Sequence, residues 1–183
     1  MPTPEEFRQR LREVDGQLVL EEFLLVEHAK HVSPTEMAYI SKRVCKRFSV
    51  DETGLKLWIV GSAKMGFSLS EKRLKNGELL PRYRSFRPDS DIDVAIVHPQ
   101  IFELIWNELS GHAHRAPFWP WNSYLLGDYL VCGWLRPDHF PRDARLGKCD
   151  EWWDCFRALS NESYLGRRKV RGGLYYSQVH LEK

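Results

Sequence analysis

Two short apolar runs constrain how this chain of 183 residues can fold. The first, Leu55–Val60, ends in Gly61 and Ser62, and the second, Asp91–Val97, opens with two aspartates separated by one residue. Runs of this length that are rich in Val and Ile favour buried strands, and a glycine after such a run favours a turn. The chain is therefore expected to pack a small sheet whose strands carry polar groups at their ends.

The paired aspartates predict a cation site. Because residues i and i+2 of a strand point to the same side, Asp91 and Asp93 are expected to present oxygens to one spot. Ile92 and Val94 then face the other way. Close carboxylates repel and lose solvation when buried, so the pair suits Mg²⁺ better than a core. The structural alternative is an acid at a strand edge that caps a turn with Ser90.

The Gly-Ser pair predicts an anion site. A strand that ends in Gly61 and feeds a short helix lets the backbone approach a ligand closely, with free amides at the helix start. Ser62 adds a hydroxyl donor, and Lys64, one turn into the expected helix, is a further phosphate candidate. A phosphate cradle beside paired carboxylates indicates chemistry on a metal-bound nucleotide.

These motifs resemble the signature of the DNA polymerase β-like nucleotidyltransferase superfamily. The resemblance consists of Gly61 and Ser62 after an apolar strand, then Ser90 and the alternation of Asp91 and Asp93 with apolar residues. It implies an α+β fold in which a short mixed β-sheet is flanked by helices. It also implies that Gly61, Ser62 and Ser90 bind the nucleotide, and that Asp91 and Asp93 are catalytic and ligate Mg²⁺ or Mn²⁺.

The activity implied by this resemblance is Mg²⁺-dependent transfer of a nucleoside monophosphate from an NTP, in a small prokaryotic protein of a defence or toxin system. The acceptor stays open between a protein, a nucleic-acid end and another nucleotide. Two alternatives belong to other classes. One is a nucleotide-binding or regulatory module that has lost turnover, and the other is a nucleic-acid-binding module.

A third carboxylate on a later strand is usual in active members of this superfamily. The strand expected at Tyr129–Leu135 contains none, and neither does the last expected strand, which Gly172 opens. Asp128 and Asp138 flank the first of these strands, and Glu182 lies near the end of the second. These three acids are the candidates for the third position.

The 28 residues between Ser62 and Asp91 make a long spacer, and its second part is strongly basic. It is expected to form a loop or a hairpin that turns near Gly77. Its basic residues are Lys72, Arg73, Lys75, Arg82, Arg84 and Arg87. Arg82, Arg84 and Arg87 alternate with aromatic residues, which suits contacts to phosphates and bases. An ordinary solvated loop is the alternative.

Helices are expected before and after this central stretch. Residues 1–50 are predicted to form a helical layer. In it, Thr3 and Ser33 are N-caps and Leu18–Val26 is the second helix. Another helix is expected to begin at Pro99 and to end at Gly111.

The expected helix at Asp150–Leu159 carries Trp152 and Trp153 as apolar anchors. The aromatic segment Phe118–Trp121 is expected to cover a pocket or a helix. His112 and His114 are interpreted as residues past a helix end rather than as metal ligands.

Composition limits the remaining classes. A chain of this length fits a single domain at 1–183, with a helical part at 1–50 and a sheet-containing core at 55–183. The net charge of +2 gives no general signal for nucleic-acid binding, and the four cysteines show no CxxC spacing. Neither a signal-peptide pattern nor an apolar run of ~20 residues is present, so a cytoplasmic protein with no membrane partner is expected. The sequence leaves the oligomeric state open.

Overall fold

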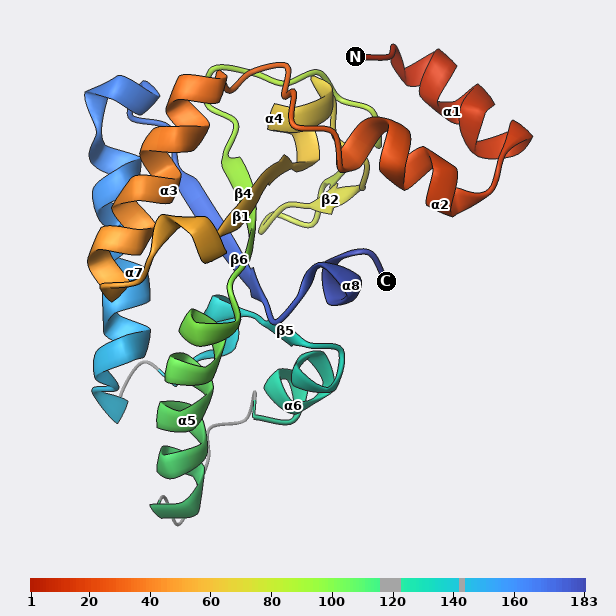
Figure 1. Cartoon of the computed structure of the whole chain (residues 1–183). Coiled ribbons are helices and arrows are strands. Elements are labelled where there is room, and N and C mark those ends of the chain that lie inside the picture. The colour runs from red at the N-terminus through yellow and green to blue at the C-terminus, as the bar shows by residue number, and fades with distance from the viewer. Residues whose placement is uncertain (116–122, 142–143) are drawn as a thin grey trace.

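The computed structural model describes residues 1–115, 123–141 and 144–183, so the aromatic segment Phe118–Trp121 lies outside the described residues. Figure 1 shows helices packed around a small central sheet. The elements in chain order are α1 (Pro4–Glu13), α2 (Gly16–Val19), the π-helical η1 (Leu20–Leu24), α3 (Pro34–Phe48), η2 (Glu52–Gly54), β1 (Lys56–Val60), α4 (Gly61–Met65), β2 (Lys72–Arg73), β3 (Leu79–Leu80), β4 (Ile92–Val97), α5 (Pro99–Arg115), α6 (Ser123–Val131), β5 (Trp134–Leu135), η3 (Pro137–His139), α7 (Gly147–Asn161), η5 (Ser163–Leu165), β6 (Val170–Tyr175) and α8 (Gln178–Leu181).

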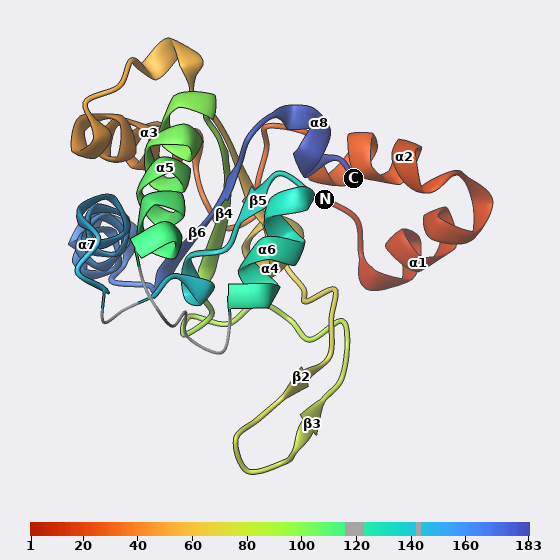
Figure 2. The ribbon, with the colours of Figure 1, turned by 90° about the horizontal axis from the view of Figure 1, so that it is seen from below.

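The central sheet is mixed and has the order β1-β4-β6-β5. Strands β1 and β4 are antiparallel, β4 and β6 are parallel, and the short β5 is antiparallel to β6. This confirms the expected small mixed sheet with flanking helices. Strands β2 and β3 form a separate hairpin that projects from the body of the protein (Figure 2), with Gly77 in the turn at φ +88°.

Helices α3, α5 and α7 cover one face of this sheet (Figures 1 and 2). The apolar residues of β4 alternate into this interface, with Ile92 and Val94 at most 2% exposed. They join Ile40 of α3, Ile105 of α5 and Trp152 of α7 in one hydrophobic cluster. This arrangement confirms that Ile92 and Val94 face away from the side that carries the two aspartates.

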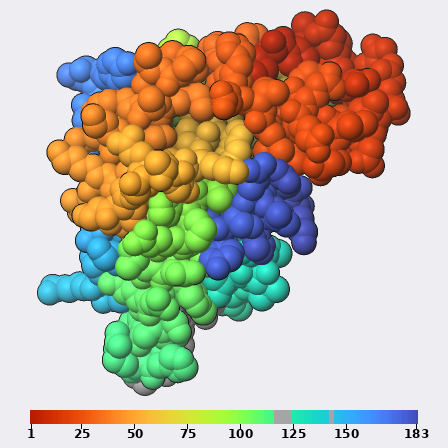
Figure 3. Space-filling model, viewed as in Figure 1, coloured from red at the N-terminus to blue at the C-terminus, as the bar shows by residue number. Residues whose placement is uncertain are grey.

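The N-terminal helices do not form the single layer expected for residues 1–50. Helix α3 belongs to the main core, whereas α1 and α2 pack in a second cluster made of Phe7, Val19, Met65 and Phe67. In Figure 3 the first residues of the chain form a lobe at one end of the molecule. This lobe buries its apolar side chains against Met65 of α4 and against Phe67, not against the sheet.

Both predicted N-caps, Thr3 and Ser33, are present, and each belongs to a capping box. The Thr3 hydroxyl accepts from the Glu6 amide at 3.2 Å, and the Ser33 hydroxyl accepts from the Glu36 amide at 3.2 Å. In return, the carboxylate of each glutamate accepts from the backbone amide of its cap residue. The helix expected at Leu18–Val26 begins and ends two residues earlier, because α2 starts after a cap at Asp15 and continues as the π-helical η1 to Leu24.

Two predictions at the centre of the chain were wrong. Residues 129–135 are not one strand, because α6 runs to Val131 and a left-handed turn at Gly133 (φ +66°) precedes the two residues of β5. Leu126 and Leu130 lie four residues apart on α6 and both pack on the main core, so tertiary burial selects the helix. Gly111 does not end α5, which continues to Arg115.

The extension of α5 brings His112 and His114 inside its last turn rather than past its end. Basic side chains there still suit the negative end of the helix dipole. No described helix is long and apolar enough to span a membrane.

Candidate functional site

The Gly-Ser turn and the aspartate pair lie side by side because β1 and β4 pair antiparallel. The register joins Val60 to Asp93, so Gly61 follows directly beside the Asp93 carboxylate. Gly61 has φ +66°, and a Cβ at this position would lie 3.2 Å from Asp93 Oδ2. Any other residue would therefore be strained and would crowd the carboxylate. The structure thus brings together two motifs that are 28 residues apart in the chain.

Helix α4 contributes less to an anion site than the sequence suggests. Ser62 is half-buried in its first turn, as expected. The helix is only five residues long and ends at Gly66, so its peptide dipoles sum to little. The close approach that Gly61 allows is the feature of this turn that remains available to a ligand.

Lys64 has a different contact from the expected one with phosphate. Its side chain is fully buried, and its ammonium donates to the backbone carbonyl of Val26. Burial lowers the pKa of Lys64 to about 8. Lys64 therefore stabilises the segment that precedes α3, and its ammonium is occupied there.

Asp91 and Asp93 occupy the same side of β4 and its N-terminal extension, but their surroundings differ. The Asp91 side chain is 25% exposed and forms an ion pair with the Arg171 guanidinium, 2.8 Å away. Burial is the main influence on Asp93 and raises its pKa. The Arg171 charge opposes this rise, the Asp91 charge adds to it, and the charges of Lys72 and Lys169 oppose it less strongly. Three cations thus act on the Asp93 carboxylate.

Arg171, one residue before the expected start of the last strand, lies beside Asp93 because β6 begins at Val170. In the parallel register of β4 and β6, the residue beside Asp93 is Arg171. Residues in register on neighbouring strands point to the same face, so the guanidinium shares the face of the two aspartates. The basic run at 167–171 is visible in the sequence, but the pairing of β6 with β4 is not.

Ser90 serves the turn that leads into β4. Its hydroxyl accepts from the Arg87 amide at 3.0 Å, and its own amide donates to the Arg87 carbonyl at 2.9 Å. These bonds show the turn expected at Ser90, but they do not involve the Asp91 side chain. The Ser90 hydroxyl fixes the direction in which Asp91 enters the site.

The candidates for a third carboxylate have other partners or positions. Asp138, in η3, binds Arg136 at 2.6 Å, and although burial alone would raise its pKa, this partner holds that pKa below the ordinary value. Asp128 is exposed on α6, and Glu182 accepts from Gln178 at 2.6 Å. Among the described residues, no group of three or more Asp, Glu, His or Cys could hold a metal ion.

Arg82, Arg84 and Arg87 have partners within the spacer. Arg82 lies 3.9 Å from Glu71, and Arg87 lies 3.1 Å from Asp89. Arg84 donates to the carbonyls of Ser70 and Pro81. The spacer residue whose charge acts on Asp93 is instead Lys72, at the start of β2.

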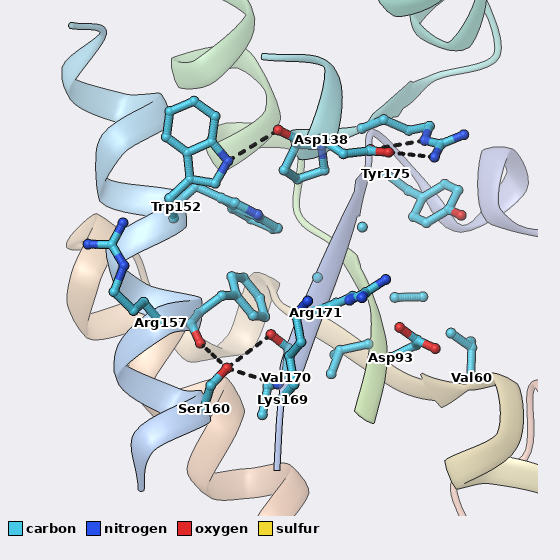
Figure 4. Close-up of a pocket in the computed structure, with 18 of the residues that line it drawn as sticks. Val60, Asp93, Asp138, Trp152, Arg157, Ser160, Lys169, Val170, Arg171 and Tyr175 are labelled. Atoms are coloured by element: carbon cyan, nitrogen blue, oxygen red, sulfur yellow. Dashed lines mark hydrogen bonds and ion pairs between the residues drawn. The ribbon is translucent and has the colours of Figure 1, made fainter. Parts of the chain in front are cut away.

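A cleft of about 910 Å³ adjoins Asp93 and wraps around β6 (Figure 4). Asp93 and Arg171 lie on one side of the strand, and Arg157 and Ser160 of α7 lie on the other. Its polar lining also includes Lys169. A cavity of this size holds a small organic ligand, and its cations favour an anionic one.

Aromatic residues line the far end of the same cleft. The rings of Trp134 and Tyr175 stack at 5.4 Å with an interplanar angle of 8°, and the Arg136 guanidinium lies 5.2 Å from the Trp134 ring. The Trp134 indole nitrogen is buried and donates to no acceptor within the described chain. No sequence pattern indicated that these residues share a site, because only the pairing of β5 with β6 brings Trp134 beside Tyr175.

Searches of protein-family models, of curated protein sequences and of solved structures found no match to this chain.

Proposed function

We propose that this protein is a Mg²⁺-dependent nucleotidyltransferase of the DNA polymerase β-like superfamily, which transfers a nucleoside monophosphate from an NTP to an acceptor. The antiparallel pairing of Val60 with Asp93 carries this proposal, because it sets the Gly61 turn against the Asp93 carboxylate. A turn with open backbone beside a carboxylate pair suits a triphosphate and its cation together.

The side chains at this site fit a divalent cation that arrives with phosphates. Mg²⁺ prefers oxygen ligands, and protein sites commonly supply one or two carboxylates while substrate phosphates and water supply the rest. Asp91 and Asp93 provide such a pair. Mn²⁺ accepts the same kind of ligands. A bound cation would offset charge on the triphosphate and favour attack by the acceptor hydroxyl.

The remaining residues of the site would bind and orient the nucleotide. Gly61 lets the phosphates approach the backbone, and Lys72, Lys169 and Arg171 supply positive charge around Asp93. The aromatic end of the cleft offers ring faces to a base, with the buried Trp134 N–H as a free donor. The identity of the base and of the acceptor is part of what the experiment below measures.

A nucleotide-binding regulatory module is the second candidate, and one observation favours it. Arg171, not an acid, lies beside Asp93 on the neighbouring strand. A third carboxylate normally serves the side of the nucleophile, so a cation in this place would weaken turnover more than nucleotide binding. A nucleic-acid-binding module is supported only by the basic hairpin, and it predicts binding that falls steeply with salt and ignores Mg²⁺.

The test compares neutral variants of three aspartates. Each α-³²P-labelled NTP is incubated with Mg²⁺ or Mn²⁺, the protein and candidate acceptors, namely the protein itself, tRNA and nucleotides. Label transfer that falls by at least ~100-fold in Asp93→Asn and Asp91→Asn is expected, because neither amide replaces a charged metal ligand. Asp89→Asn is the matched control, since Asp89 is exposed and pairs with Arg87 outside the site.

Two results would change this conclusion. Mn²⁺-dependent nucleotide binding without label transfer would favour the regulatory module. Equal transfer by wild type and Asp93→Asn would refute the proposed site.

A further inference from the structure

Arg171 pairs with one of the carboxylate oxygens that a cation at the aspartate pair would bind. Its guanidinium nitrogen lies 2.8 Å from Asp91 Oδ2, and its backbone is in register with Asp93. A divalent cation would need to approach the same oxygens to ~2.1 Å. A guanidinium and a divalent cation against one carboxylate would repel each other, and the Asp91 carboxylate between them is only 25% exposed.

We propose that Arg171 is a positioning residue that closes the Asp91/Asp93 pair to free divalent cations and opens it to a cation that arrives with a triphosphate. This inference rests on the proposed function, because it needs a metal-bound nucleotide as ligand. It assigns Arg171 two alternative partners, the Asp91 carboxylate in the free protein and a phosphate of the nucleotide in the complex.

The side chain of Arg171 has the freedom and the chemistry for this exchange. It is 54% exposed and lines the cleft, so it turns from Asp91 toward a ligand without leaving a buried position. A guanidinium binds phosphate through two parallel hydrogen bonds, and a triphosphate carries more charge than one carboxylate. The exchange would leave Asp91 free for the cation and keep every charge paired.

Arg157 offers a matched comparison. It lines the same cleft on the other side of β6 and pairs with Asp154 of its own helix at 2.9 Å. Replacing it by glutamine removes one positive charge from the cleft without releasing Asp91. A general effect of cleft charge would change both variants equally, whereas the proposed exchange concerns Arg171 alone.

The experiment measures Mn²⁺ binding by electron paramagnetic resonance for wild type, R171Q and R157Q, first without nucleotide. We expect R171Q to bind Mn²⁺ ~5-fold more tightly than wild type, because loss of the half-exposed ion pair with Asp91 removes a competitor for that carboxylate. R157Q is expected to match wild type. Calorimetry with nonhydrolysable analogues of the four NTPs and Mn²⁺ should then show ~10-fold weaker nucleotide binding to R171Q.

These outcomes separate the inference from the proposed function. If wild type binds Mn²⁺ and nucleotide together, but R171Q binds Mn²⁺ alone no more tightly than wild type does, the inference is wrong and the proposed function stands. If neither wild type nor R171Q binds nucleotide, with or without Mn²⁺, the proposed function is wrong. The exchange of Arg171 from Asp91 to a phosphate is then wrong as well. Misfolding does not imitate the expected result, because a misfolded variant does not gain a cation site.

Discussion

At the scale of single residues, Lys64 shows how a lysine beside a Gly-Ser turn serves the fold. Its ammonium donates to the Val26 carbonyl, while its own carbonyl accepts from the Lys30 amide at 3.0 Å. His31 adds a bond to the Ala63 carbonyl at 3.1 Å. These contacts join residues 26–31 to α4, so Lys64 stabilises the turn at Gly61 through its own helix.

The buried Lys64 predicts a dependence of stability on pH. Its pKa is lowered to about 8 in the folded protein, against 10.5 for an ordinary lysine. Below pH 8 both states are protonated and burial of the charge costs stability in full. Between about pH 8 and pH 10.5 the unfolded chain binds more protons, so the free energy of unfolding rises with pH through Lys64.

The difference in unfolding free energy between wild type and Lys64→Met, followed by urea denaturation, isolates this contribution. We expect the unfolding free energy of wild type to rise relative to that of the variant from pH 8 to pH 10.5. Below pH 7 the difference between the two should be constant. A difference that does not change with pH would show that Lys64 titrates normally in the folded protein.

At the scale of elements, the β2–β3 hairpin brings one of its basic residues to the site. Lys72 acts on the pKa of Asp93, whereas the arginines of the spacer bind partners within it. The hairpin projects away from the sheet beyond this point (Figure 2). Lys72 and the spacer arginines with local partners therefore have separate roles in the proposed complex.

Two single neutralisations test this division. Lys72→Gln is expected to weaken Mn²⁺-dependent nucleotide binding ~3- to 10-fold, because a phosphate contact to a surface lysine contributes on that order. Lys75→Gln, between the strands of the same hairpin, should leave the nucleotide affinity unchanged. Calorimetry on both variants measures this, and equal losses would show that only the total charge of the hairpin matters.

At the scale of the whole molecule, the described residues form two hydrophobic clusters that stabilise different parts of the protein. The larger joins the sheet to α3, α5 and α7, and the smaller joins the N-terminal lobe to α4 through Phe7, Met65 and Phe67. Phe7 packs its ring edge against Phe67 at a centroid distance of 6.0 Å. The lobe therefore stabilises the turn that forms one side of the candidate site.

Removal of one ring from the smaller cluster is expected to act locally. Phe7→Ala leaves a cavity that costs about 3 kcal/mol, and hydrogen exchange should quicken in residues 4–24 and in α4 while β4 and α7 stay protected. Leu11→Ala is the control on the same helix, because Leu11 is 46% exposed. Exchange that quickens evenly along the chain would show one cooperative unit instead.

The sequence by itself determined the local elements and the residue types of the site. Apolar runs marked the main strands, cap residues such as Ser33 marked helix starts, and a glycine marked the hairpin turn, because these signals act over a few residues. The two halves of the candidate site, at Gly61 and Asp93, were likewise visible as motifs.

Only the tertiary structure decided which distant residues meet. The register of β1 on β4 sets Gly61 against Asp93, and that of β6 on β4 sets Arg171 beside Asp93. Burial also places Lys64, a phosphate candidate in the sequence, against the backbone that it stabilises, and it favours a helix rather than a strand at Ser123–Val131. Strand pairing and burial depend on the packing of the whole chain, so no local pattern fixes them.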